Sequence, residues 1–267
     1  MCLIVFAWQR HPEFPFVFAG NRDEFFARAT ESAHWWGTRR QILAGRDLQA
    51  GGTWCGVTST GRFAALTNFR GPNEKKSDAP SRGHLVSDFL EGAAEPVAYL
   101  RAMKDSKRLY NGFNLLLGEH LLGPGEPTLW IDSNRDPKTP LLLEPGIYGV
   151  SNARLDTPWP KVEIAKARLT SALDAMSPEH LVANLFELLA DSTRAPDSKL
   201  PKTGVSLALE RDLSAAFVRL DGYGTRASTV MVLDRGGRLR FIERSFGEAG
   251  QTGELQYEVR SEAAAPT

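Results

Sequence analysis

The sequence predicts an α+β fold in which two antiparallel sheets carry helices on their outer faces. Short apolar runs typical of buried strands occur in neighbouring pairs, as they do in hairpins. Two groups of amphipathic segments interrupt these runs, so the order along the chain is strands, helices, strands, helices, strands. No repeat indicates a solenoid. We therefore expect one layered domain spanning residues 1–267.

The first quarter of the chain is rich in predicted strands. Apolar runs bounded by charged or glycine-containing turns cover residues 3–8, 14–19, 53–58 and 62–67. The first two runs are separated by a short polar, proline-containing segment, which predicts a hairpin of buried strands. The chain is thus expected to begin inside a sheet, with more antiparallel pairing following.

The remaining elements alternate between helical and strand-like patterns. Apolar spacings of three and four residues predict helices over residues 85–91, 97–103, 160–175 and 178–189. Strand composition returns at residues 113–117, 128–131, 146–150, 228–234 and 238–245. The last two strands form a predicted hairpin around Gly236-Gly237. Residues 195–203 are expected to form a loop, and the terminal residues 263–267 to be frayed.

Composition excludes several classes of partner. Lysine plus arginine and aspartate plus glutamate both number 32, so the balanced charge implies no general attraction to nucleic acid or anionic membrane. No window approaches the ~18 apolar residues that cross a bilayer. The apolar start of the chain lacks the basic region of a signal peptide. We expect a soluble protein with neither a membrane span nor a nucleic-acid partner.

Cysteine and histidine usage points to a reducing compartment without a metal centre. Cys2 and Cys55 are too few for a disulfide framework or a cysteine-based zinc site. The five histidines are scattered without the spacing of metal ligands. Phosphate-loop, dinucleotide and serine-hydrolase motifs are missing as well. A cytoplasmic location and no metal are expected.

Cys2 has a position that gives it chemical interest. A small residue after the initiator methionine allows Met1 to be removed, which leaves a free α-amine and a thiol on one residue. The amine has a pKa of about 7.7–8.0, so part of it is unprotonated near neutrality and can act as a base for the thiol. The alternative is that Cys2 is a small buried residue at the start of a strand, as many cysteines are.

Polar residues follow the strand that is expected to pair with the one beginning at Cys2. Asn21, Arg22 and Asp23 lie at its end, and hairpin pairing brings that end near Cys2. Asp23 is a natural partner for an ammonium group. The alternative is an ordinary turn, since asparagine and aspartate are common turn residues.

Three further strand ends carry polar side chains that acyl transfer can use. Asn68 and Asn152 each follow an apolar strand and can donate an amide hydrogen to an oxyanion, while Arg226 lies at a third polar strand edge. Each alone is ordinary turn chemistry. Together they supply donors for the negative charge that develops beside a nucleophile.

Eight short motifs in order then resemble those of the NRDE family, also called the Transport and Golgi organisation protein 2 family, over nearly the whole chain. They are Met1-Cys2, Asn21-Arg22-Asp23-Glu24, Gly51-Gly52-Thr53-Trp54, Ala65-Leu66-Thr67-Asn68, Asn111-Gly112-Phe113-Asn114, Val150-Ser151-Asn152, Leu200-Pro201-Lys202-Thr203-Gly204-Val205 and Tyr223-Gly224-Thr225-Arg226. That family in turn resembles the N-terminal nucleophile hydrolases of the penicillin V acylase, bile salt hydrolase and acyl-CoA:isopenicillin N acyltransferase type.

The resemblance implies a four-layer αββα sandwich and cleavage of nonpeptide C–N amide bonds. It also implies a role for each catalytic candidate. Cys2 resembles the nucleophile, Asp23 the acid that holds its α-amine, Asn152 and Asn68 the oxyanion donors, and Arg226 the arginine that tunes the thiolate. We expect Asn21, Arg22 and Trp54 to contact the substrate.

Two functions are consistent with these residues. One is an amidohydrolase or acyltransferase that acts on a small amide or acyl (thio)ester and needs no cofactor. The other is a carrier of haem or an acyl lipid in the same cleft, since family members have been linked to haem trafficking and acyl-CoA metabolism. Six aromatic residues are available to cover such a cargo or to form core: Phe25, Phe26, Trp35, Trp36, Trp54 and Phe69. The oligomeric state is left open.

Overall fold

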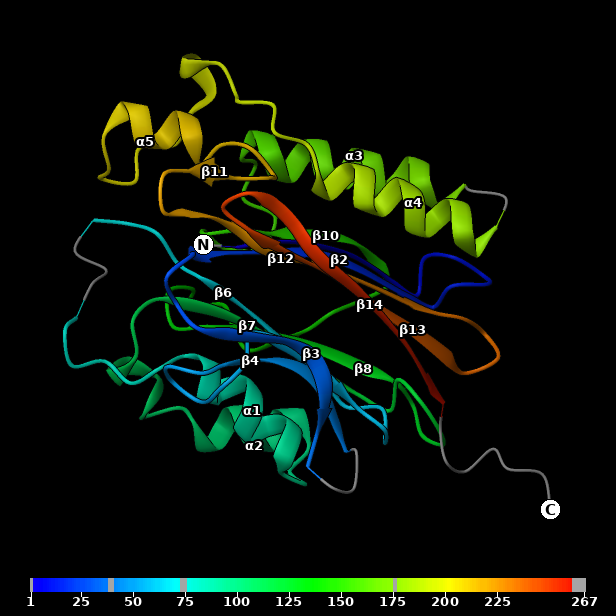
Figure 1. The fold of residues 1–267 in the computed structure, drawn as a ribbon. Helices are drawn as coiled ribbons and strands as arrows, with labels where there is room; N and C mark the ends of the chain where they lie inside the picture. Colours follow the sequence, from blue (N-terminus) through cyan, green and yellow to red (C-terminus); the bar gives the residue numbers. More distant parts are fainter. Residues whose placement is uncertain (1, 38–40, 73–75, 175–176, 261–267) are drawn as a thin grey trace.

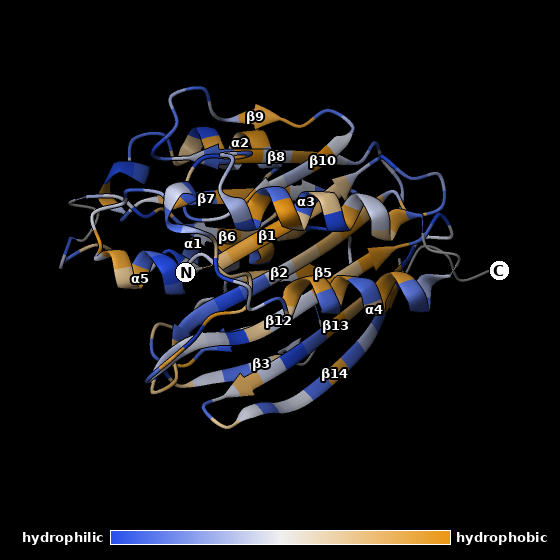
Figure 2. Cartoon of the chain, turned by 90° about the horizontal axis from the view of Figure 1, so that it is seen from above, coloured by the Kyte–Doolittle hydropathy of each residue, from blue (hydrophilic) through white to orange (hydrophobic). Residues whose placement is uncertain are grey.

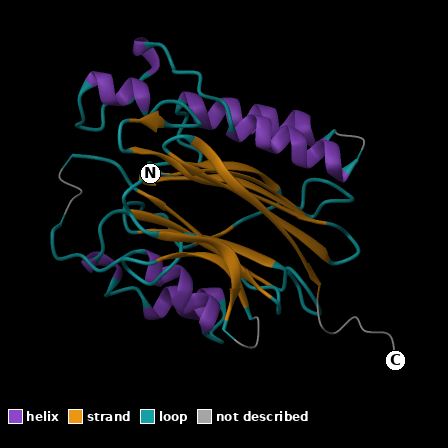
Figure 3. Cartoon of the chain, in the orientation of Figure 1, coloured by secondary structure: helices purple, strands orange, loops and turns teal. Residues whose placement is uncertain are grey.

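A computed structural model describes residues 2–37, 41–72, 76–174 and 177–260. The expectations about Met1 removal and the frayed residues 263–267 lie outside these ranges. Two antiparallel sheets face each other, and helices cover the outer face of each (Figures 1 and 3). The predicted four-layer αββα arrangement is therefore confirmed.

The first sheet contains both the N-terminal strand and the C-terminal strands. Its order is β10-β1-β2-β12-β13-β14, with β11 beside β12. The strands are β1 (Cys2–Trp8), β2 (Phe16–Phe25), β10 (Gly146–Val150), β11 (Arg219–Leu220), β12 (Tyr223–Leu233), β13 (Arg238–Gly247) and β14 (Gly250–Arg260). The sheet thus joins segments that are far apart in sequence.

The second sheet is built from the middle of the chain in sequential order, β3-β4-β5-β6-β7-β8-β9. Its strands are β3 (Thr30–Trp36), β4 (Ile42–Asp47), β5 (Cys55–Thr58), β6 (Phe63–Asn68), β7 (Phe113–Glu119), β8 (Thr128–Ser133) and β9 (Leu141–Leu142). Each neighbouring pair is antiparallel.

Helices α3 (Pro160–Leu173) and α4 (Pro178–Leu189) cover the first sheet, and α1 (Gly83–Glu91) and α2 (Pro96–Ala102) cover the second. Figure 2 shows apolar strand segments beneath α3 and α4. The short helix α5 (Leu207–Asp212) and two 3-10 turns, η1 (Lys107–Leu109) and η2 (Asp197–Lys199), complete the described elements. None of the helices in the described ranges is long and apolar enough to cross a membrane.

Three apolar cores hold these layers together, and the largest lies between the sheets. It includes Phe6, Phe16, Phe18 and Phe63, which are all fully buried. Full burial of such a side chain stabilises the fold by about 1.5–3 kcal/mol relative to exposure. The other cores lie between each sheet and its helices. Strands β1 and β2 therefore have two buried faces, which explains why their sequences are nearly continuous apolar runs.

The strand and helix predictions are confirmed with shifts of a few residues, except that residue 175, the predicted end of the helix from residue 160, lies outside the described ranges. One placement was wrong. Residues 21–24 do not follow the second strand; they lie inside it, because β2 continues to Phe25. This part of β2 pairs with β1 through Arg22 opposite Cys2, and with β12 through Asp23 opposite Thr225. Two neighbouring ladders satisfy the backbone, so polar side chains that are typical of turns remain in an extended strand.

The elements that were not predicted from sequence are β3, β4, β9, β11, β14, α5 and the two 3-10 turns. Strand β3 has Ala33 as its one buried residue, and β14 is exposed along most of its length. Strands at the edge of a sheet lack the regular apolar alternation that identifies a strand with one buried face. Helix α5 has six residues, with Glu210 its one buried side chain, so it has no apolar periodicity either.

Candidate active site

Strand geometry directs Cys2 and Arg22 into the space between the sheets. Successive side chains of a strand point to opposite faces. In β1, Ile4 and Phe6 belong to the core between the sheets, so Cys2 points the same way. In β2, Phe18 also lies in that core, and Arg22 shares its face. Cys2 and Arg22 are directly opposite each other in the ladder and are 5% and 8% exposed.

A cavity of about 600 Å³ opens at this end of the two sheets. The first sheet contributes Cys2, Arg22, Glu24, Arg226 and Glu243 to its wall. The second sheet and its connections contribute the opposing residues Asn68, Trp54, Ser81, Arg82 and Asn111. The cavity wall is predominantly polar and charged, and the thiol of Cys2 is part of it.

Asp23 is buried beside the start of β1, with its carboxylate held by neighbouring strand β12. Its Oδ1 accepts a hydrogen bond from Thr225 Oγ1 at 2.8 Å, and the Tyr223 hydroxyl donates to its backbone carbonyl at 3.2 Å. A bulge between Thr225 and Ala227 inserts Arg226 as an extra residue and gives Thr225 this position. Burial raises the pKa of Asp23, while the positive charge of Lys161 acts in the opposite direction.

Lys161 is a buried cation near Asp23 that the sequence reasoning missed. It lies in the first turn of α3, and its Nζ donates to the carbonyl of Leu213 at 3.0 Å. Burial lowers its pKa to about 8, although the charge of Asp23 favours the protonated form. The sequence did contain a sign that Lys161 is buried. Lys161 lies four and eight residues before the buried Ala165 and Leu169, so all three share one face of the helix.

The local environment favours the neutral form of the Cys2 thiol. Burial raises its pKa, and the negative charge of Asp23 raises it further. The positive charge of Arg22 and a backbone hydrogen bond from Asp23 lower it in part. The Cys2 carbonyl accepts a hydrogen bond from Ser151 Oγ at 2.8 Å, which fixes the residue at the strand end. Reaction at this sulfur therefore requires a base that removes its proton.

Asn68 and Asn152 meet across the gap between the sheets. The side-chain amide of Asn152 donates to the backbone carbonyl of Asn68 at 2.8 Å. The backbone carbonyl of Asn152 accepts from the backbone N–H of Arg70 at 2.7 Å. An amide group has two N–H donors, and the bond to Asn68 uses one. Asn68 lines the cavity, whereas Asn152 is fully buried behind it.

Arg226 lies on the cavity wall, but its hydrogen bonds go to the backbone. Its guanidinium donates to the carbonyls of Phe25, Phe26 and Arg28 at 2.9–3.0 Å, and to that of Phe246 at 3.3 Å. It thereby ties the connection after β2 to the end of β13. Its predicted effect on the thiolate would act through charge rather than contact.

The structure places Asn21 away from the cavity. It points to the helical side of the sheet, where its amide donates to the carbonyls of Leu189 and Ala216, both at 2.8 Å. Its Oδ1 accepts from Ser228 Oγ at 2.6 Å. These bonds attach the helical layer to β2, so the position of Asn21 does not bring it to a substrate in the cavity.

Trp54 is the one member of the six aromatic candidates on the cavity wall within the described residues. Its indole lies over Gly20, where an added Cβ would come within 3.1 Å of the ring. Gly20 thus leaves room for Trp54. Phe25 is 61% exposed, and the Trp36 indole donates to the Ala44 carbonyl, so the candidates do not form one apolar wall.

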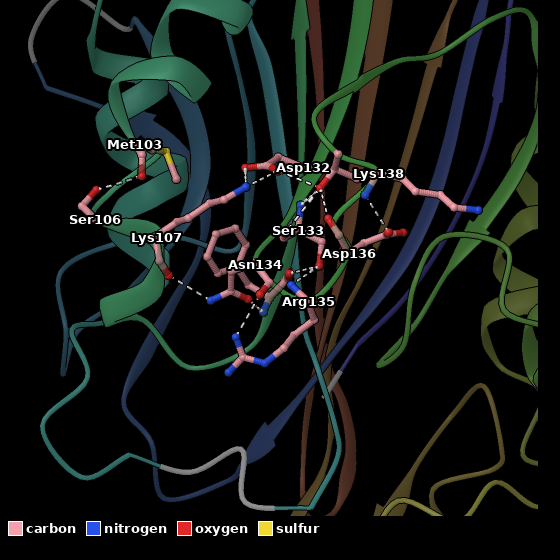
Figure 4. Close-up of polar contacts among 11 residues, drawn as sticks. Met103, Ser106, Lys107, Asp132, Ser133, Asn134, Arg135, Asp136 and Lys138 are labelled. Carbon is pink, nitrogen blue, oxygen red and sulfur yellow. Dashed lines mark hydrogen bonds and ion pairs between the residues drawn. The ribbon is translucent and has the colours of Figure 1, made fainter.

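The Asn111-Gly112 segment at the rim of the cavity is fixed by a polar network (Figure 4). Asn134 donates to the carbonyls of Lys107, Tyr110 and Asn111, and its Oδ1 accepts from the Phe113 N–H. Lys107 pairs with the buried Asp132 at 2.9 Å. Arg82 also donates to the Gly112 carbonyl at 2.9 Å. The asparagines of the motif have other partners: Asn111 exchanges two hydrogen bonds with the Lys76 backbone, and Asn114 donates to Thr67 Oγ1 and to the Ala153 carbonyl.

A buried ion pair between Arg70 and Glu210 lies close to the strand ends that carry Asn68 and Asn152. Arg70 Nη2 lies 2.8 Å from Glu210 Oε2, and both side chains are less than one-tenth exposed. Glu210 Oε1 accepts from the backbone N–H of Thr203 at 2.8 Å and from its hydroxyl. The Leu200–Val205 motif and α5 are thus connected to Arg70, whose backbone holds Asn152.

Glu243 is a buried carboxyl group on the cavity wall that the sequence did not reveal. It lies on β13, is 3% exposed, and accepts from the backbone N–H of Ala33 in the opposite sheet at 2.7 Å. Burial raises its pKa. The sequence showed Glu243 as a polar residue within the apolar pattern of β13. Its partner could not be predicted, because Ala33 belongs to strand β3 of the opposite sheet.

The raised pKa of Glu243 predicts a pH-dependent effect of Glu243→Gln. Below about pH 4 the Glu243 carboxyl group is mostly protonated in both the folded and the unfolded wild type. As pH rises through the higher folded pKa, ionising the buried carboxyl costs stability. Glutamine does not titrate and still accepts from Ala33. The free energy of unfolding of the variant minus that of the wild type should therefore increase between pH 4 and pH 8, measured by denaturant unfolding.

The exposed Glu187 on α4 provides the control. For Glu187→Gln the same difference should change much less over this range. A difference for Glu243→Gln that stays flat or decreases with pH would contradict the prediction.

Fold and cavity together define a layered αββα protein with a cysteine, an arginine and a buried aspartate gathered at one end of a sheet. The chain belongs to the Transport and Golgi organisation 2 family, whose sequence model matches residues 1–248. The family resemblance stated from the motifs is confirmed.

Relatives extend across animals. The chain is 35% identical over 259 residues to the human Transport and Golgi organization protein 2 homolog, covering 92% of this chain and 93% of the relative. The mouse homolog is 34% identical over 258 residues with the same coverage. The Drosophila melanogaster protein is 30% identical over 264 residues, covering 92% of each chain.

Two solved structures match this chain at low similarity. The Caenorhabditis elegans orthologue of N-acylethanolamine-hydrolyzing acid amidase has a TM-score of 0.48 and 12% identity, covering 86% of this chain and 92% of that one. A mutant conjugated bile acid hydrolase from Clostridium perfringens has a TM-score of 0.41 and 8% identity, covering 99% and 94%.

Proposed function

We propose that this chain is a cysteine amidohydrolase or acyltransferase that acts on a small nonpeptide amide or acyl thioester, with Cys2 as nucleophile once Met1 is removed. The observation that carries the proposal is the position of Cys2. It begins a buried strand on the wall of a cavity, opposite Arg22 and beside the buried carboxyl group of Asp23.

The proposed reaction begins with proton transfer from the thiol to the free α-amine of Cys2. Because burial favours the neutral thiol, a base at the same residue supplies the missing activation. Asp23 would hold the ammonium group that results. It is positioned for this by its bond to Thr225 and by its place in the strand next to Cys2.

The thiolate then attacks the substrate carbonyl, and the electron pair of the C=O bond moves to oxygen. An amide hydrogen from Asn68 on the cavity wall would stabilise this oxyanion. The second amide hydrogen of Asn152 would join it once the Asn68 side chain turns aside, because Asn152 is buried behind Asn68. Collapse breaks the C–N bond, and the leaving amine takes the proton from the ammonium group. Water, or an amine in acyl transfer, then attacks the thioester carbonyl and gives a proton to the free α-amine. The C–S bond breaks, and the α-amine returns the proton to the sulfur, which regenerates the thiol.

Intact-mass measurement on protein purified from its native host, followed by acyl trapping, tests the proposal. Loss of one methionine mass and a stable acyl adduct on the Cys2 peptide, after exposure to activated amides of varied chain length, are expected. Retention of Met1 would contradict it, because the amine would then be acylated and unable to act as a base. Titration with haem in the same preparation, followed by its Soret band, distinguishes a carrier from an enzyme.

A further inference from the structure

Arg22 has an unsatisfied donor in the cavity. Its Nη1 is buried and has no hydrogen-bond partner among the described residues. Its Nη2 has a distant ion-pair contact with Glu24, at 3.9 Å. A buried charged donor without a partner is costly, and a ligand that accepts its hydrogen bond offsets this cost. Arg22 is 8% exposed and lines the cavity.

The carboxylates near Arg22 are already used by other groups. Glu24 is shared with Arg28, at 3.9 Å, and Asp47 accepts two bonds from Arg28 at 2.8 Å. Arg226 interacts electrostatically with Arg22 and has backbone carbonyls as its hydrogen-bond acceptors. The cavity wall also carries Arg46, Arg82 and Glu31, so among the described residues five guanidinium groups face three carboxylates before the two buried carboxyl groups are counted.

Two buried carboxyl groups, those of Asp23 and Glu243, also line the cavity, but each already has partners of its own. Glu243 accepts from Ala33 of the opposite strand, and its burial favours the protonated form. Asp23 belongs to the other face of β2, where it interacts with Thr225 and Lys161. The excess of positive charge therefore stays on the side of the sheet that faces the cavity.

We propose that the cavity binds an anionic group of the substrate on Arg22, so that the amide attacked by Cys2 carries a carboxylate or a phosphate close to the scissile bond. This inference rests on the proposed function. Directly opposed side chains in an antiparallel pair have Cβ atoms about 4.5–5.5 Å apart. An anion held by the Arg22 guanidinium is thus separated from the carbonyl at Cys2 by a few bonds. An acyl group joined to a short amino acid or amino phosphate has this shape.

The test compares three amides with the same acyl chain. N-decanoylglycine carries a carboxylate, N-decanoyl-O-phosphoethanolamine a phosphate, and N-decanoylglycinamide no charge. In the wild type, kcat/KM for one anionic amide should exceed that for the glycinamide by about ten- to a hundredfold, since a charge-assisted hydrogen bond is at stake. The anionic amide with the higher kcat/KM shows whether Arg22 prefers a carboxylate or a phosphate.

Substitutions at Arg22 separate recognition from general effects on the thiol. Arg22→Gln should remove the preference for the anionic amide, and Arg22→Lys should restore part of it, mainly through KM. The preference is a ratio, so a change in thiol reactivity that affects all three substrates cancels. Arg235→Gln, in the exposed turn at the far end of β12, is the matched control and should keep the wild-type ratio.

A binding measurement keeps the inference testable if no amide is hydrolysed. Calorimetric titration of Cys2→Ala protein with the same three amides measures recognition without turnover. Hydrolysis of all three amides at equal efficiency, unchanged by Arg22→Gln, would overturn the inference and leave the proposed function intact. If neither turnover nor an acyl-enzyme is observed, the proposed function is rejected. The inference about Arg22 is rejected as well if calorimetry gives equal affinities for the charged and uncharged amides.

Discussion

Replacing Cys2 with alanine or serine is expected to lower kcat/KM for a hydrolysable amide by more than about a thousandfold, since removal of a nucleophile removes the covalent route. The acyl adduct on the N-terminal peptide should disappear from the mass spectrum. Serine is the more informative change, because it keeps the approximate size and the polarity of the side chain. Both variants keep the hydrogen bond from Ser151 to the backbone carbonyl of residue 2. Its hydroxyl is a weaker nucleophile at neutral pH.

Cys55 provides the matched control for this experiment. It is the other cysteine of the chain, it is 2% exposed, and it packs in the core between the sheets. Burial raises its pKa well above the ordinary value, so it is an inert thiol. Cys55→Ala should keep the adduct and the turnover. Full activity of Cys2→Ala would show that another group is the nucleophile.

Replacing Glu210 with glutamine is expected to reduce the free energy of unfolding by about 3–5 kcal/mol, because it leaves the charge of Arg70 buried without its partner. The two side chains are 4% and 9% exposed, and the ion pair is 2.8 Å long. Equilibrium unfolding in denaturant measures the loss. The double variant Glu210→Gln/Arg70→Met should be more stable than Glu210→Gln, since it removes the unpaired charge.

The neighbouring residue Arg211 supplies a comparison at the surface. It pairs with Asp197, but both side chains are about half exposed. Asp197→Asn should therefore cost far less stability, because solvent screens the pair. Equal losses from Glu210→Gln and Asp197→Asn would contradict the importance of burial for the Arg70–Glu210 pair.

The sequence predicted those elements of the fold whose local pattern reflects burial. Most strands in the cores and the helices with an apolar face were found, because each has its own pattern. Strand β4 was missed although its residues 42–44 are buried, since its apolar run is only three residues long. Strands β3 and β14 are held by pairing with other strands rather than by an apolar face, so nothing in their residues identified them. The Asn21–Glu24 segment was taken for a strand end, because its side chains carry no signal of the β12 ladder beside it.

The candidate site could be predicted only as a list of reactive residue types. Cys2 and Asp23 were named because of their chemistry and their separation in a hairpin. Lys161, Glu210 and Glu243 were missed, since their partners Leu213, Arg70 and Ala33 lie far away in sequence. Asn21 was grouped with Arg22, although alternation along a strand sends neighbouring side chains to opposite faces. Applied to that strand, the rule separates them.

The two sides of the cavity differ in how they are built. Cys2 and Arg22 lie within paired strands of the first sheet, where two ladders fix the backbone. Trp54, Arg82 and Asn111 lie in connections between elements of the other half. Connections accept substitutions, insertions and deletions far more readily than paired strands. Relatives could therefore diverge in ligand preference by remodelling one wall while the reactive wall stays unchanged, and a designer could exploit the same division.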